Sequence, residues 1–111
     1  MILETSPLGS ALLAIVKIKE GNMSLAEQFK TELLTLIDNG NKHIIVSFEH
    51  VIYVDSSFLG ALVSALKHAM NKGADIAVVS LNKDIKSLFQ LVRLDKVFKI
   101  YATAQQALNG A

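Results

Sequence analysis

The fold of this chain is decided by the stretch Val51-Ile52-Tyr53-Val54-Asp55-Ser56-Ser57-Phe58-Leu59-Gly60. Its first four residues are β-branched or aromatic, which is typical of a strand, and apolar residues then recur at helical spacing from Leu59 to Met70. A strand therefore runs straight into a helix, and Ser57 lies at the helix N-terminus. Free backbone N–H groups and the positive end of the helix dipole favour a carboxylate, a bound anion or a phosphate at that position.

The Asp-Ser-Ser segment also has a simpler interpretation. Asp and Ser are the commonest residues at helix starts, so a helix cap would explain all three without any function.

The residue pattern of the helix that follows indicates a functional surface. Its expected buried stripe consists of Leu59, Leu62, Val63, Leu66, Ala69 and Met70. Its expected outward face consists of Ser57, Gly60, Ala61, Ser64, Ala65 and His68. Solvated helix faces are usually rich in Lys, Glu and Gln, so this small, nearly uncharged face predicts a surface covered by a partner protein or by another part of the chain.

Hydrophobic patterns along the rest of the chain predict an α/β fold. Strands are expected at residues 2–6, 11–18, 43–48, 51–54, 75–80 and 97–101, the first two joined as a hairpin. A capping box over residues 24–27 begins a first helix that ends at Asn39-Gly40, Asn82 caps a third helix, and Thr103 with Gln106 caps a short fourth one. The order predicts one domain over residues 1–111, with a mixed sheet of about five strands, an N-terminal hairpin at its edge and about four helices.

Composition limits the function classes. About half of the 111 residues are hydrophobic, and 11 basic residues nearly balance 10 acidic ones with no basic cluster, so no nucleic-acid partner is expected. The absence of cysteine excludes disulfides and fits a reducing compartment. We find no signal peptide and no apolar run of the roughly 20 residues that cross a bilayer, and we expect a cytoplasmic protein without membrane insertion.

The chain shows no pattern of an enzyme or a metal site. His43, His50 and His68 are too scattered for a metal pair on one helix, and neither a nucleophile elbow nor a phosphate-binding loop is present. We therefore expect no catalytic activity, no cofactor and no metal. His68 could share a helix face with Ser57 and contact a partner.

Two motifs in this order resemble the STAS domain, and most closely the stand-alone bacterial anti-sigma factor antagonists. They are Val54-Asp55-Ser56-Ser57-x-Leu59-Gly60 and Leu94-Asp95-x-x-Phe98-x-Ile100. The resemblance extends from about Leu12 to Leu108.

The resemblance implies a regulatory protein–protein switch. In that family the second serine of the pair, Ser57 here, is phosphorylated by a serine kinase of histidine-kinase-like ATPase fold that is also the anti-sigma factor. The unmodified form binds this kinase and frees the sigma factor, and a phosphatase opposes the kinase. The partner-binding residues implied for this chain are Asp55, Ser56, Phe58, Gly60, Ala61, Ser64 and His68. An alternative is a STAS accessory subunit of a lipid-transport ABC system or of a stress-sensing complex.

The sequence departs from the family at two places. Phe58 stands where a glycine is usual, and Gly21-Asn22-Met23 stands where a Leu-Asp type sequence commonly leads into the first helix. Phe58 is either a core side chain beneath the turn or an exposed anchor that fills a pocket of a partner. We expect the exposed anchor, because the helix face beside it is small and uncharged.

Overall fold

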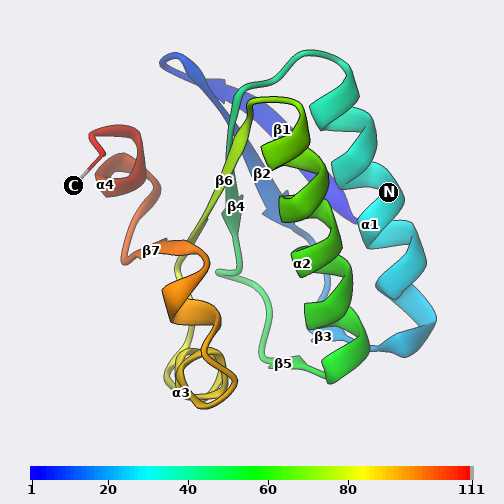
Figure 1. Cartoon of the computed structure of the whole chain (residues 1–111). Helices are drawn as coiled ribbons and strands as arrows, with labels where there is room; N and C mark the ends of the chain where they lie inside the picture. The colour runs from blue at the N-terminus through cyan, green and yellow to red at the C-terminus, as the bar shows by residue number, and fades with distance from the viewer. Residues whose placement is uncertain (111) are drawn as a thin grey trace.

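A five-stranded mixed sheet with helices on both faces forms the centre of the structure, a computed structural model that describes residues 1–110 (Figure 1). The elements in chain order are β1 (Leu3–Leu8), β2 (Ala11–Val16), β3 (Glu20–Gly21), α1 (Met23–Asp38), β4 (His43–Ser47), β5 (Tyr53–Val54), α2 (Ser56–Asn71), β6 (Asp75–Val79), α3 (Lys83–Leu91), the 3-10 turn η1 (Leu94–Lys96), β7 (Lys99–Tyr101) and α4 (Ala104–Leu108).

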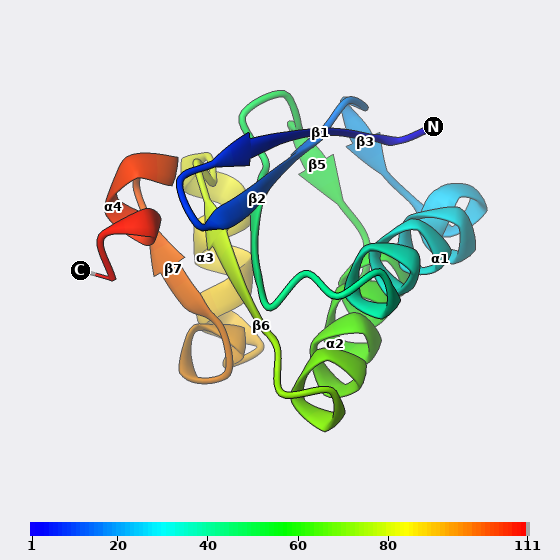
Figure 2. The same ribbon diagram turned by 90° about the horizontal axis from the view of Figure 1, so that it is seen from above.

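The strand order in the main sheet is β1-β2-β4-β6-β7. Strands β1 and β2 form an antiparallel hairpin at one edge, and every other pair is parallel. The predicted α/β fold with an edge hairpin is thus confirmed. Because connections between parallel strands are right-handed, α1 and α2 lie side by side on one face of the sheet (Figure 2).

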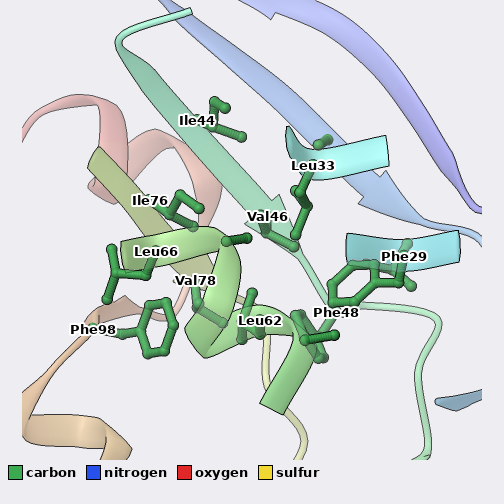
Figure 3. Packing of buried hydrophobic residues seen from close by; sticks show 14 of the residues in the cluster. Phe29, Leu33, Ile44, Val46, Phe48, Leu62, Leu66, Ile76, Val78 and Phe98 are labelled. Carbon is green, nitrogen blue, oxygen red and sulfur yellow. The ribbon is translucent and has the colours of Figure 1, made fainter. Parts of the chain in front are cut away.

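The larger core lies between that face and the helices (Figure 3). Phe29 and Leu33 of α1 and Leu62 of α2 are fully buried there, together with Ile44 and Val78 of the sheet. The opposite face has a smaller cluster that α4 covers, in which Ala107 packs with Ile45 and Val79. Helix α3 contributes Phe89 to the larger core, where its ring meets Phe48 edge-on at 6.3 Å.

Two sequence predictions need correction. The expected strand at 51–54 is only the short β5, and it pairs with β3 in a separate two-stranded sheet. The first helix begins at Met23, because the side chain of Asn22 accepts a hydrogen bond from Ser24 N–H at 3.1 Å and takes the capping role predicted for Ser24. The caps predicted at Asn82 and Thr103 are confirmed.

Within residues 1–110, none of the helices combines the length and the apolar character needed to span a membrane. The same part of the chain contains no group of three or more potential metal-ligating side chains.

Glu32 of α1 is hydrogen-bonded to the backbone at the start of the edge strand β1. Its two carboxylate oxygens accept hydrogen bonds from Ile2 N–H and Leu3 N–H, both at 2.9 Å. Burial alone would raise the pKa of Glu32, but these bonds, a third from Gln28 and the charge of the N-terminus outweigh it and hold the pKa below its ordinary value. The ionised carboxylate therefore stabilises the start of β1.

We expect Glu32→Gln to lower the free energy of unfolding at neutral pH by about 1–2 kcal/mol, because a charged acceptor of two backbone N–H groups becomes neutral. A folded-state pKa below the unfolded one gives stability that is present above the unfolded pKa and is lost as pH falls through the folded pKa. The free energies of unfolding of wild type and Glu32→Gln, measured by urea melts, should therefore converge as the pH falls from above the unfolded pKa of Glu32 through its folded pKa. The matched control is Glu27→Gln, an exposed position on the same helix, which should show no such convergence.

Candidate regulatory surface at the N-terminus of helix α2

The N-termini of α1 and α2 are held next to each other by the short β3–β5 sheet. Gly21 pairs with Val54 in this sheet, and Asp55 N–H donates to the Gly21 carbonyl at 2.8 Å. Ile52 N–H donates to the Lys19 carbonyl at 2.7 Å. Because both strands are parallel and each leads directly into a helix, the two helix starts face the same end of the molecule.

The carboxylate of Asp55 joins these two helix starts. Its Oδ1 accepts a hydrogen bond from Phe58 N–H at 2.9 Å, which caps α2, and its Oδ2 accepts one from Met23 N–H at 2.8 Å, at the first residue of α1. One negative charge thus meets the positive ends of two helix dipoles. The predicted cap is present, and it also ties two separate elements together.

Ser57 lies in the first turn of α2 and is half-buried, while the preceding Ser56 is exposed. The first hydrogen bond within the helix runs from Leu59 N–H to the Asp55 carbonyl at 3.1 Å. The N–H groups of Ser56 and Ser57 precede that bond, at a position suited to solvating an anion.

Phe58 is a core residue, so the expected exposed anchor is wrong. Its side chain is fully buried and stacks on Phe29 of α1, with ring centroids 4.1 Å apart and an interplanar angle of 10°. A Cβ atom at Gly21 would lie 2.6 Å from this ring. The two departures from the family therefore fit each other in space: glycine at position 21 leaves the room that the ring at position 58 fills.

The side of α2 that packs against α1 contains residues for which the sequence predicts an outward position. Phe58 at its start and His68 at its end both contact α1, and between them, at helical spacing, lie Ala61 and Ala65, whose exposed fractions are 7% and 0%. Ala61 is therefore not available to a partner. The small residues of this side let the two helices approach each other.

His68 is paired within the chain. Its Nε2 atom lies 2.7 Å from Oδ1 of Asp38, near the end of α1. The hydrogen bond with His68 is the main cause that lowers the pKa of Asp38; burial opposes it, and the charges of His68 and Lys72 add to it. Asp55, Ser56, Ser57, Gly60 and Ser64 remain together on the N-terminal half of α2, and the structure sets His68 apart from them.

Ser56, Gly60 and Lys67 of α2 are exposed, and Ser64 between them is half-buried. These four residues define the exposed strip of α2. A Cβ atom at Gly60 would have no neighbour within 4 Å, so the space above this residue is open. Met70, predicted as buried, is 66% exposed on the same outer side.

An apolar groove that the sequence does not predict lies between β5 and α3. Ile52 and Tyr53 are 61% and 54% exposed, and they line a hollow of about 240 Å³ together with Leu88 of α3. Their exposure follows from the departure of β5 from the main sheet, for which the local sequence carries no signal.

Comparisons with known proteins agree with this geometry. The model of the STAS domain family matches residues 22–107. A protein of Thermotoga maritima named "Putative anti-sigma factor antagonist" is 32% identical over 92 residues, which cover 82% of this chain and 81% of that protein.

Solved structures agree as well. A crystal structure with the same description and species has a TM-score of 0.85 and 25% identity, covering 97% of this chain and 92% of that one. The phosphorylated form of the Bacillus cell fate determinant SpoIIAA shares the fold with a TM-score of 0.71 and 18% identity, covering 96% of each chain.

Replacement of Phe58 by alanine should reduce the free energy of unfolding by about 3–5 kcal/mol, because it removes a buried ring that is stacked on Phe29. Gly21→Ala should also be destabilising, since the new methyl group collides with that ring. Thermal and urea melts measure both effects. Gly60→Ala, on the open side of α2, is the matched control and should be neutral or stabilising. A stable Phe58→Ala protein would contradict the buried position.

Asp55→Asn should keep the cap of α2 but loosen the start of α1, because one of the two carboxylate oxygens is replaced by an N–H donor facing Met23 N–H. We expect a loss of about 1 kcal/mol for Asn and about 2 kcal/mol for Asp55→Ala. Hydrogen exchange measured by NMR should show faster exchange at Met23 N–H in both variants and at Phe58 N–H only in the alanine variant. Equal protection at Met23 in all three proteins would disprove the link.

Proposed function

The chain belongs to the STAS domain family of anti-sigma factor antagonists, and from this premise we propose that it is a protein–protein switch controlled by phosphorylation of Ser57. In its unmodified form it binds an anti-sigma serine kinase of histidine-kinase-like ATPase fold in the cytoplasm and thereby frees a sigma factor. Phosphorylation by that kinase ends the complex, and a phosphatase restores the unmodified form. The chain regulates by binding rather than by catalysis.

The position of Ser57 is the observation that carries this proposal. It is half-buried in the first turn of α2, beside N–H groups that precede the first helical hydrogen bond. A phosphate would add about −1.5 to −2 charges at a place where the helix dipole tolerates them. The structure of SpoIIAA from Bacillus in its phosphorylated form, which shares the fold, supports the proposal that this fold accepts a phosphate.

The exposed strip of α2 is the proposed docking surface for the kinase. Gly60 has no side chain and open space above it, so the partner can approach the backbone close to Ser57. Asp55 belongs to the edge of this surface, and Ser64 continues it by one turn along the helix. The groove at Ile52 and Tyr53 offers adjacent apolar area for the same partner.

Control by charge requires that the first turn stays in place when the phosphate is added. Two features support this: Asp55 ties the start of α2 to the start of α1, and the buried Phe58 anchors the same turn in the core. The phosphate then changes the charge of the docking surface without refolding it, and acidic groups of the partner would be repelled.

The proposal is tested with the cognate anti-sigma serine kinase. Incubation with ATP should place one phosphate on Ser57, as read by mass spectrometry of the peptide that contains Asp55. Ser57→Ala should bind the kinase and resist modification. Ser57→Asp should bind at least tenfold more weakly while its melting temperature stays within a few degrees of wild type, because an acidic residue in a first helical turn is neutral to stabilising by about 0.3–1 kcal/mol.

Ser10→Ala in the turn between β1 and β2 and Ser87→Ala on α3 are the controls, since each removes an exposed serine hydroxyl group outside the docking surface. Both should be phosphorylated normally. Phosphate on Ser56 with Ser57 unmodified, or undiminished binding by Ser57→Asp, would refute the switch. Stable association with transporter subunits and no phosphate on Ser57 would favour an accessory-subunit role instead.

A further inference from the structure

A second hollow lies on the other flank of α3, away from the groove at Ile52 and Tyr53. Its volume is about 290 Å³, and it is enclosed by α3, η1 and the edge strand β7. Figure 1 shows these three elements together on the side of the sheet opposite the hairpin of β1 and β2. The side chains around it are those of Leu81, Lys86, Gln90, Asp95, Ile100 and Tyr101.

Two side chains of opposite charge, Lys86 and Asp95, line this hollow, and they do not form an ion pair with each other. Lys86 and Gln90 are four residues apart and therefore share one face of α3, while Asp95 comes from η1. The ion pairs among residues 1–110 are His50 with Glu49, His68 with Asp38 and Lys99 with Asp75, so neither Lys86 nor Asp95 belongs to one.

The walls of the hollow are amphipathic. Leu81 and Ile100 are half-buried and give it an apolar side, and Tyr101 adds a half-buried ring with a hydroxyl group. A volume close to 300 Å³ lies at the lower end of the range for small-molecule sites, in which an apolar wall and a few polar groups orient the ligand.

The hollow lies at the carboxyl ends of two parallel strands. Leu81 follows the carboxyl end of β6, and Tyr101 ends the parallel neighbour β7.

From these observations we propose that the hollow between α3, η1 and β7 binds a small zwitterion of the α-amino acid class. Lys86 receives the carboxylate and Asp95 the ammonium group, Gln90 and Tyr101 supply hydrogen bonds, and the ligand's side chain packs on Leu81 and Ile100. A ligand with only negative charge would be opposed by Asp95, and one with only positive charge by Lys86. The site is independent of Ser57 and of kinase binding.

The test is an NMR titration of the full-length, isotope-labelled protein with each proteinogenic L-amino acid in turn, up to about 10 mM, which detects even weak binding. We expect at least one amino acid to give saturable shifts confined to the amides of α3, η1 and β7. Its N-acetyl and carboxamide derivatives should each bind about tenfold more weakly or worse, because each lacks one of the two charges.

Lys86→Met and Asp95→Asn should each reduce the affinity for that amino acid by about tenfold or more, the effect of losing one charged hydrogen bond. Lys83→Met, on the same helix but outside the hollow, is the control and should bind like wild type. The absence of saturable shifts with every amino acid would overturn the proposal. Equal binding of the blocked derivatives, or unchanged affinity in both the Lys86 and Asp95 variants with intact spectra, would overturn it too.

Discussion

The two hydrogen bonds accepted by the carboxylate of Asp55 are the constraint on which the arrangement of the two helix starts depends. One of them caps α2 at Phe58 N–H, and the other reaches Met23 N–H at the start of α1. Without this carboxylate, backbone N–H groups at the starts of α1 and α2 would lack a hydrogen-bond acceptor. The positive dipole ends of the two helices would also lie close together without a negative charge between them. The single half-buried carboxylate of Asp55 accepts a hydrogen bond from each helix start.

The packing of α2 against α1 decides which side chains of its first turns are buried. With Asp55 in place, Phe58 points into the interface with α1, where Phe29 stacks on it and Gly21 gives it room. Ser57 and Gly60 are then left on the outer side. The burial of the aromatic ring and the partial exposure of Ser57 are thus consequences of one geometry.

Helix α3 separates the two hollows at the carboxyl ends of the parallel strands. One flank, with Leu88, faces β5 and the docking surface, and the other, with Lys86 and Gln90, faces β7. The proposed protein-docking surface and the proposed small-molecule site therefore lie on opposite flanks of one helix.

Local chemistry in the sequence determined the elements, their order and most helix caps, because periodicity and capping depend only on neighbouring residues. Asp55 as a cap and Ser57 in a first helical turn could be read in this way, as could the α/β fold with its edge hairpin. The sequence does not show which side of α2 is covered by α1, and for that reason Phe58, Ala61 and Ala65 were predicted to be exposed although they are buried. The tertiary structure alone decided it, because β5 pairs with β3 rather than with the main sheet and brings the start of α1 against the start of α2. Pairing between segments about 30 residues apart is a long-range contact, and neither segment has a sequence pattern from which the pairing could be predicted.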